Sequence, residues 1–334
     1  MQSNIISIKN CSGCGDILAH FPKEKRFVSI IDASIAPIYN SYLPHPQVHI
    51  SVSEKFKRLK EVERLALLLM EMDVDRDTTI VAVGGGVITD LVGFVASTYM
   101  RGLPFIFVPT TLLAMVDASI GGKNGVNLMN YKNIIGLFRM PEFTLICPQF
   151  LQTLPPKEFR NGWAEMVKSF IMADRQSYFA FMSLTEEQLN LYPEIAPYLL
   201  KAAEIKMTIV ERDPLEKGER KLLNLGHTFA HAMELEGRIP HGAAVGIGIA
   251  LAAKLSVKLS LLDQSECDTI VRGLLQVGLP TASPIPMNRM VDSMKRDKKR
   301  SGEVINLILI KKIGEAVVYP LPVSKLKEAL HDLS

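Results

Sequence analysis

Short apolar runs alternate with amphipathic stretches between residues 27 and 150. This alternation predicts a parallel sheet covered by helices, with buried strands at FVSIID (27–32), TTIVAV (78–83), FIFVPT (105–110) and FTLICP (143–148). The segment 54–72 has apolar residues at three- and four-residue steps, which predicts a helix with one apolar face, formed by Phe56, Leu59, Val62, Ala66 and Leu69. We therefore expect this half of the chain to be α/β.

The pattern changes near residue 155. Strand-like runs disappear, and helical segments rich in Ala, Leu, Glu, Lys and Met continue to about residue 275. The segment TLPPKEF (153–159) marks the change, because two adjacent prolines cannot continue a helix and usually sit just before one. We interpret VINLILI (304–310) as a late strand. A chain of 334 residues is also too long for one ordinary core, so we expect an α/β domain at 1–154 and a mainly α-helical domain at 155–334.

Composition narrows the class of protein. A hydrophobic fraction of 48% with 22% charged residues is typical of a soluble globular protein, and a net charge of +3 gives no basis for a nucleic-acid or anionic-membrane surface. The start MQSNIISIKN does not resemble a signal peptide, and no apolar run reaches transmembrane length. We expect a cytoplasmic protein whose partners are small molecules.

The four cysteines are Cys11, Cys14, Cys147 and Cys267, too few and too scattered for a disulfide framework. This usage suits a reducing compartment. Cys11 and Cys14 form a CSGC pair, but no second pair completes a four-sulfur zinc site. We interpret the pair as two small residues near a turn rather than as a redox or metal motif.

A glycine-rich turn is the first candidate site. VAVGGGVITDLVGFVAS (81–97) places three glycines between a strand and a helix, where backbone N–H groups can approach a phosphate. The spacing GGGxxxD differs from the GxGxxG of the ordinary dinucleotide fingerprint, so a tight structural turn stays an alternative. In the following PTTLLAMVDASIGGKNGVN (109–127), Thr110, Thr111 and Lys123 are placed to meet a cofactor or an anion. A helix cap and a glycine turn would explain the threonines but not the lysine.

The helical half carries charges in apolar surroundings. NGWAEMVKSF (161–170) puts Glu165 and Lys168 three positions apart on one helix face. On an exposed helix this would be a weak ion pair. Because the segment is so apolar, a weak surface ion pair does not explain why it carries both charged residues.

Three of the seven histidines fall within NLGHTFAHAMELEGRIPHGAAV (224–245). His227 and His231 lie at i and i+4, a spacing that can place two imidazoles on one metal, and His241 follows after a turn. Spacing alone favours His227 with His231 as the metal pair, and it leaves open that all three are solvated or core histidines.

Taken together, these motifs resemble those of the 3-dehydroquinate synthase family, within the sugar-phosphate cyclase superfamily. The similarity runs through most of the chain: the EKFK turn, GGGVITD, STYMRG, VPTTLLAMVDASIGGKNGVN, YKNIIG, FLQTLP, NGWAEMVK, LLNLGHTFAHAME, HG at 241–242 and DKK at 297–299. It implies a homodimer with an N-terminal Rossmann-like NAD-binding domain and a C-terminal helical domain for metal and substrate, the site lying in the cleft between them.

The resemblance also implies a different metal pairing. In the family a divalent ion, zinc or cobalt, is held by residues matching Glu165, His227 and His241. Three protein ligands leave positions open for a substrate, as catalysis by a Lewis acid requires. His231 then faces the substrate or supports the metal site.

The family reaction converts 3-deoxy-D-arabino-heptulosonate 7-phosphate, a phosphorylated and carboxylated sugar acid, into 3-dehydroquinate and phosphate. NAD takes a hydride, phosphate leaves, NADH returns the hydride, and an intramolecular aldol step closes the ring. The resemblance implies that NAD is contacted by Asp32, Glu54, Lys57, Gly85, Gly86, Asp90, Thr110, Thr111, Lys123, Lys132, Thr153 and Leu154. It implies substrate contacts by Lys123, Asn133, Lys206, Arg220, Asn224, His231 and Lys299, with Asp117 and Lys168 beside the metal and Arg101 inserted from the partner subunit.

Six positions depart from the commonest family pattern: Thr89, Ser34, Ala118, Asn124, Tyr131 and Ala243. None removes an implied metal ligand, although Ala243 changes the surroundings of His241 and Ala118 removes a hydroxyl beside Asp117. The alternatives are a sibling cyclase acting on sedoheptulose 7-phosphate or glucose 6-phosphate, a metal-dependent polyol dehydrogenase, and a non-catalytic paralogue. Lys206 and Arg220 favour the first reaction, because the sibling substrates lack a carboxylate.

Overall fold

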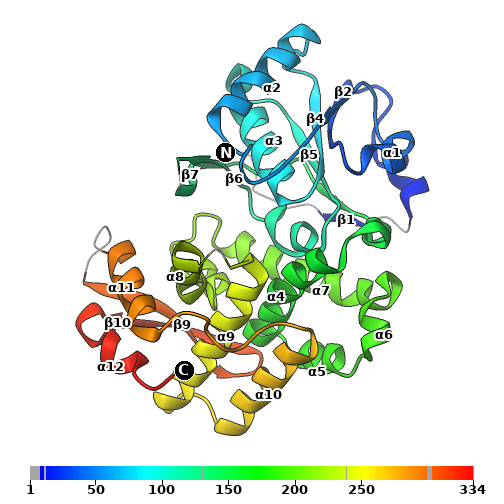
Figure 1. Ribbon diagram of the computed structural model, residues 1–334. Helices are drawn as coiled ribbons and strands as arrows, with labels where there is room; N and C mark the ends of the chain where they lie inside the picture. Colours follow the sequence, from blue (N-terminus) through cyan, green and yellow to red (C-terminus); the bar gives the residue numbers. More distant parts are fainter. Residues whose placement is uncertain (1–7, 11–12, 130, 238, 299–302, 334) are drawn as a thin grey trace. The chain divides into compact units, whose positions relative to one another are not determined.

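The computed structural model describes residues 8–10, 13–129, 131–237, 239–298 and 303–333. The chain forms two compact units, Met1–Pro155 and Pro156–Ser334. In Figure 1 the first unit runs from blue to green and the second from green to red. Among the described residues, no helix combines the length and the apolar character needed to cross a membrane.

A six-stranded parallel sheet forms the centre of the first unit. All four strands predicted from apolar runs are present, and they pair in parallel, as in the registers Ile30 with Ala82 and Val81 with Ile106. Two short strands at the sheet edges were not predicted, because they have three or four residues and little apolar character. The sheet order is β1 (Ile8–Asn10), β8 (Thr144–Ile146), β5 (Phe105–Pro109), β4 (Thr79–Gly84), β2 (Phe27–Asp32) and β3 (Gln47–Ile50).

Two helices, α2 (Leu59–Glu71) and α3 (Gly86–Thr98), share the hydrophobic core with this sheet. The predicted apolar face of the first helix was partly wrong. Phe56 lies in the turn before α2 and is 51% exposed, and Leu59, the first helical residue, is 44% exposed. Of the predicted face, Leu69 is buried and Val62 packs half-buried against the core, and the helix also buries Leu65, which was not predicted.

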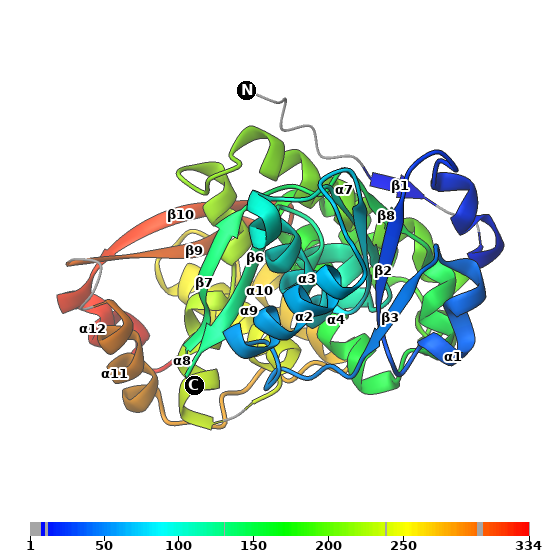
Figure 2. The same cartoon turned by 90° about the horizontal axis from the view of Figure 1, so that it is seen from above.

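The same unit contains a two-stranded antiparallel hairpin, β6 (Lys123–Leu128) and β7 (Tyr131–Phe138), which packs against α3. Figure 2 shows these strands side by side. The sequence patterns did not predict it, because its glycines and polar residues lack the alternation of a half-buried strand. The remaining short elements are α1 (Ala36–Tyr39), a π-helical turn at Ala114–Ala118 and 3₁₀ turns at Cys14–His20, Asn40–Tyr42, Tyr99–Arg101 and Pro148–Thr153.

The second unit is mainly helical, as predicted. Its first helix begins at Pro156, directly after Pro155, where the proline pair predicted a helix start. Helix α9 is apolar on nearly every side and packs against α4, α8 and α10. The helices are α4 (Pro156–Ala173), α5 (Arg175–Met182), α6 (Glu186–Leu189), α7 (Tyr192–Arg212), α8 (His227–Gly237), α9 (His241–Lys258), α10 (Gln264–Gln276), α11 (Met287–Lys298) and α12 (Leu326–Leu330), with 3₁₀ turns at Glu219–Asn224 and Val323–Lys325.

An antiparallel ribbon of β9 (Val304–Lys312) and β10 (Glu315–Pro322) completes this unit, and it is visible at the left of Figure 2. The late strand predicted at 304–310 is therefore present. Its partner was missed because β10 contains two prolines and is mostly half-buried, so it shows no clear apolar run.

Candidate metal centre and cofactor site

Helix α4 brings Glu165 and Lys168 into the interior of the second unit. Their side chains are 1% and 2% exposed, and the Lys168 Nζ forms an ion pair with Glu165 Oε2. Burial by itself raises the pKa of Glu165, but Lys168 and the imidazoles of His227 and His241 outweigh it and hold that pKa well below its ordinary value. Glu165 is thus a buried, ionised carboxylate.

His227 is the first residue of α8. It follows Gly226, whose φ of 80° is in the left-handed region that favours glycine, and a Cβ on Gly226 would lie 2.9 Å from the backbone nitrogen of Ile249 in α9. This close approach places the imidazole beside Glu165, with Nε2 3.4 Å from Glu165 Oε1. The other ring nitrogen, Nδ1, lies 3.2 Å from the carbonyl oxygen of Leu225.

His241 is the first residue of α9. Its Nε2 lies 3.2 Å from Glu165 Oε1, and its Nδ1 lies 2.9 Å from Glu234 Oε1. The backbone nitrogen of the next residue, Gly242, donates to Asn161 Oδ1 on α4 at 3.1 Å. The start of α9 is therefore fastened to the helix that carries Glu165.

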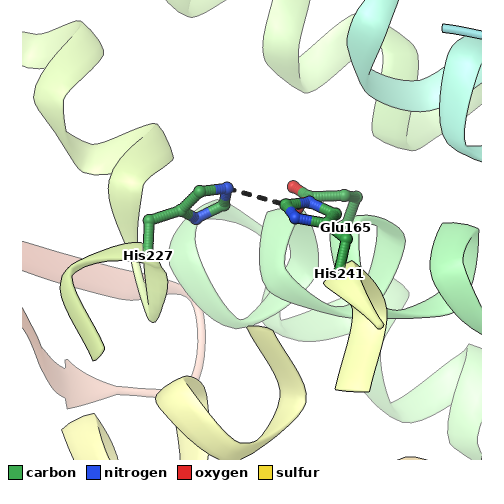
Figure 3. Close-up of side chains that lie close together, drawn as sticks. All are labelled: Glu165, His227 and His241. Atoms are coloured by element: carbon green, nitrogen blue, oxygen red, sulfur yellow. Dashed lines mark hydrogen bonds and ion pairs between the residues drawn. The ribbon is translucent and has the colours of Figure 1, made fainter. Parts of the chain in front are cut away.

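Figure 3 shows the three side chains pointing toward one another from α4, α8 and α9. One ligand atom from each of Glu165, His227 and His241 lies within 4.8 Å of the others, and no further group of this kind occurs among the described residues. The i and i+4 spacing favoured His227 and His231 as the metal pair, but the group that forms contains His241 in place of His231. His231 sets its ring at right angles to that of His227, with centroids 5.8 Å apart.

The donor set fits a divalent cation. Each Nδ1 faces an oxygen acceptor, so Nδ1 is the protonated nitrogen when the ring is neutral, and both Nε2 lone pairs face the same carboxylate oxygen. Lone pairs directed at an anionic oxygen repel unless a cation lies between them. One carboxylate and two imidazoles are ligands that zinc prefers.

The pKa values of the two rings agree with such a role. Burial lowers the pKa of His227 to about 4, which keeps this ring neutral. Burial also acts to lower the pKa of His241, but hydrogen bonds to Glu165 and Glu234 outweigh it and raise that pKa to about 10. The carboxylates around His241 thus attract a positive charge, which a proton or a metal ion can supply.

Several polar side chains predicted to bind substrate lie elsewhere in the second unit. Lys206 on α7 and Arg220 in the 3₁₀ turn Glu219–Asn224 are buried, and this turn packs against both α7 and α4. Arg220 Nη1 donates to the carbonyl of Pro214 at 2.6 Å, and Asn224 Nδ2 donates to Glu216 Oε1 at 2.5 Å. Lys299 lies outside the described residues.

In the first unit, Lys57 is the centre of a polar network. It is buried, forms an ion pair with Asp90 and donates to Asn133 Oδ1 at 2.5 Å. Asn127 extends the network, because its Oδ1 accepts from the Asn133 backbone nitrogen and its Nδ2 donates to Glu54 Oε1. Burial raises the pKa of Asp90, although Lys57 opposes that shift. Predicted NAD contacts Glu54, Lys57 and Asp90 therefore belong to one cluster, which Asn133 also joins.

The carboxyl ends of three neighbouring parallel strands carry further predicted residues. β2 ends at Asp32, β4 runs into the glycine turn, and β5 is followed by Thr110 and Thr111. The Thr110 backbone nitrogen donates to the carbonyl of Gly84 at 3.0 Å, and Thr111 Oγ1 accepts from the Ala114 backbone nitrogen at 3.2 Å. This edge is where open α/β sheets bind ligands.

The other predicted residues of the first unit are distributed over its turns and hairpin. Gly85 directly precedes α3 and Gly86 is its first residue, and Thr153 Oγ1 lies 3.1 Å from the hydroxyl of Tyr39. Cys14 Sγ lies 3.9 Å from Cys147 Sγ, whereas Cys11 lies outside the described residues. The remaining positions are Leu154 after the turn Pro148–Thr153, Asp117 in the π-helical turn, Arg101 in the 3₁₀ turn after α3, Lys123 on β6 and Lys132 on β7.

Sequence reasoning missed Asn127, Asn161 and Glu234, which contact the predicted site residues. Asn127 and Asn161 contact partners distant in sequence, Glu54 and Gly242, so no local motif marks them. For Glu234 a signal exists, because it is seven positions after His227 and therefore on the same face of α8.

Comparison with known proteins shows the family of this chain. The family model described as 3-dehydroquinate synthase N-terminal matches residues 47–161, and 3-dehydroquinate synthase C-terminal matches residues 162–300. The chain belongs to the 3-dehydroquinate synthase family. A relative with that name from Dictyoglomus thermophilum is 42% identical over 91% of this chain and 89% of that protein. Another, from Coxiella burnetii, is 44% identical over 79% of this chain and 76% of that protein.

Solved structures resemble the whole chain. A 2-epi-5-epi-valiolone synthase from Streptomyces hygroscopicus, with NAD+ and Zn2+ bound, has a TM-score of 0.88 and 26% identity over 100% of this chain and 98% of that one. A butanol dehydrogenase from Thermotoga maritima shares the fold at a TM-score of 0.68, with 15% identity over 99% of this chain and 97% of that one.

Proposed function

We propose that this protein is an NAD- and divalent-metal-dependent lyase that converts 3-deoxy-D-arabino-heptulosonate 7-phosphate into 3-dehydroquinate and phosphate. The observation that carries the proposal is the convergence of Glu165, His227 and His241, from three helices, in a member of this family. The product is the carbocyclic precursor of chorismate and the aromatic amino acids in the shikimate pathway.

The proposal assigns the metal to Glu165, His227 and His241, with Zn2+ or Co2+ as the ion. A metal bound there would supply a Lewis acid for the substrate hydroxyls, and bound NAD would supply a reversible hydride acceptor. The protein residues hold charges in place for this chemistry. Lys168 keeps Glu165 ionised, and Leu225 and Glu234 accept from Nδ1 of the two imidazoles, so that each Nε2 is the ligating atom.

The proposal assigns NAD to the unit Met1–Pro155. Gly85 and Gly86 lie at the start of α3. The backbone N–H groups at this positive end of the helix favour a phosphate. The cluster of Glu54, Lys57 and Asp90 provides further polar contacts. Asp32, Thr110 and Thr111 lie at the carboxyl edge of the sheet, and Lys123, Lys132, Thr153 and Leu154 complete the proposed cofactor contacts.

Buried cations support a substrate with a carboxylate. Lys206 and Arg220 are cations in the interior of the second unit, and a carboxylate or a phosphate is the kind of substrate group that a cation binds. We assign them to the substrate carboxylate and phosphate, together with Asn224, His231, Asn133 and Lys299, and we place Asp117 beside the reacting hydroxyl.

The test is phosphate release from the heptulosonate phosphate in the presence of NAD and Zn2+. We expect phosphate to form without net accumulation of NADH, because the hydride is returned, and a chelator should abolish the reaction. Failure to release phosphate from a metal-loaded, NAD-bound preparation would rule the proposal out.

A sibling cyclase is the second candidate, favoured by the similarity to the valiolone synthase along the whole chain. Its substrates, sedoheptulose 7-phosphate or glucose 6-phosphate, lack a carboxylate. Competition between the three sugar phosphates distinguishes the two functions. NADH accumulation with a simple polyol would instead indicate a dehydrogenase, with which the chain shares its fold.

The proposal includes a cytoplasmic location and a homodimer in which Arg101 reaches the partner's site. Support for self-association comes from the β6–β7 hairpin, on which large apolar side chains are exposed: Leu128, Met129, Tyr131, Ile134 and Phe138. An apolar surface of this kind on a folded domain marks an interaction site.

A further inference from the structure

Glu234 lies on the same face of α8 as His227, two helical turns further along. Its side chain is 12% exposed, and its Oε1 lies 2.9 Å from His241 Nδ1. Helix α8 therefore contributes His227 to the metal group and also contributes Glu234, which contacts the ring nitrogen of His241 that faces away from Glu165.

The two imidazoles differ in how they are held. His227 is 15% exposed, and its Nδ1 faces the carbonyl of Leu225, only two positions away on the backbone. His241 is 31% exposed, stands at the first residue of α9, and has a side-chain carboxylate as the acceptor. The more exposed ring is thus the one whose Nδ1 faces a charged side chain.

A carboxylate at the second ring nitrogen has three consequences for a metal-binding histidine. It fixes the tautomer, holds the plane of the ring and makes the ligating nitrogen more basic. In this chain the result is that Nε2 of His241 is directed at Glu165 Oε1, 3.2 Å away, where His227 Nε2 also points.

We propose that Glu234 is a positioning residue that orients His241 for the metal and raises the affinity of the Glu165–His227–His241 group for a divalent cation. This inference rests on the metal site of the proposed function. Glu234 acts through His241 and is not itself a ligand in the proposal.

The experiment titrates purified wild-type protein, E234A and E234Q with Co2+ alone, followed by the visible absorption of the bound ion and by competition with a chelator of known affinity. We expect E234A to weaken Co2+ binding by about 10- to 100-fold. E234Q should fall between E234A and the wild type, because its amide oxygen still accepts from Nδ1 but carries no charge. The matched control is E204Q, since Glu204 is an exposed glutamate on α7 whose ion pair is with Lys201.

Two further readouts separate positioning from general damage. Circular dichroism and NAD affinity should be unchanged in E234Q, and the Co2+ absorption bands of E234A should shift in energy or intensity because the ligand field changes.

An E234A protein that binds Co2+ within twofold of the wild type, with the same spectrum, overturns the proposal, as does an E234Q protein that is folded and indistinguishable from wild type. If the wild type itself binds no Co2+, the metal site of the proposed function fails and this inference fails with it. If the wild type binds Co2+ but releases no phosphate from the heptulosonate phosphate, the proposed function fails and the role of Glu234 in metal binding still stands.

Discussion

At the scale of single residues, the charged side chains around the metal group contact partners of opposite charge. Glu165 and Lys168 are both buried and bonded to each other, and the imidazole of His241 lies between Glu165 and Glu234. A buried charge is tolerated only with a partner, and removing one partner leaves the other uncompensated. The apolar helix around Glu165 and Lys168 made such a partnership predictable, but the involvement of Glu234 was not.

Replacing Lys168 by methionine should therefore destabilise the protein by about 3–5 kcal/mol, because Glu165 keeps its negative charge in the interior. Added Zn2+ should restore more stability to K168M than to the wild type, since the ion supplies the missing positive charge. Urea unfolding with and without Zn2+ measures both effects. K201M is the control, because Lys201 forms an exposed ion pair with Glu204 worth less than about 1 kcal/mol. A loss of stability in K168M no larger than in K201M would contradict this view of the site.

At the scale of elements, the site depends on how closely α9 approaches α4 and the start of α8. A Cβ on Gly242 would lie 2.5 Å from the Cα of Asn161 and 2.8 Å from the carbonyl oxygen of Arg160, both on α4. Only glycine permits that approach without a backbone shift. The HG sequence thus has a steric reason for its glycine, next to the histidine that α9 contributes.

The substitution G242A should push the start of α9 away from α4. We expect a loss of stability of about 1–3 kcal/mol from overpacking, and a lower Co2+ affinity because His241 moves with the helix. Thermal unfolding and the Co2+ titration provide the two measurements. G15A is the comparison, because a Cβ at Gly15 would meet no atom within 4 Å. Equal Co2+ affinity in G242A and the wild type would show that α9 can shift without disturbing the metal group.

At the scale of the whole molecule, the proposed homodimer depends on an exposed apolar surface of the β6–β7 hairpin. The β6–β7 hairpin packs against α3, and on β7 the half-buried Ile135 and Leu137, which contact the core, alternate with the exposed Ile134 and Phe138. Ile134 and Phe138 therefore form an apolar patch on the outer side of the hairpin. A second copy of the chain is the partner that the proposed homodimer requires, and a two-fold interface would bury the same patch from both subunits.

We expect the double substitution I134K and F138K to convert the dimer into a monomer, because four lysines would then face one another across a two-fold interface. Light scattering after size exclusion measures the mass. The double substitution L215K and L275K serves as the control, since Leu215 and Leu275 are exposed apolar residues of the second unit. A wild-type mass of 37.1 kDa, that of one chain, would refute the dimer outright.

The sequence by itself determined the α/β half followed by the helical half, the proline-marked start of α4, the glycine turn before α3 and the family. These features depend on periodicity and chemistry within a few neighbouring positions, where a helix or strand buries its own apolar face. The weakly patterned hairpin β6–β7 and the strand β10 were missed because no such local signal accompanies them. Residue spacing favoured His227 with His231, whereas the family resemblance implied the metal group of Glu165, His227 and His241. The tertiary structure brings Glu165 and His241, 76 positions apart, into contact, and it alone decided that His241 Nδ1 faces Glu234 of α8 rather than a neighbour in its own helix. The reason is that convergence depends on packing between helices, including the glycine contacts at Gly226 and Gly242, and such packing brings together residues whose separation along the chain carries no periodic signal.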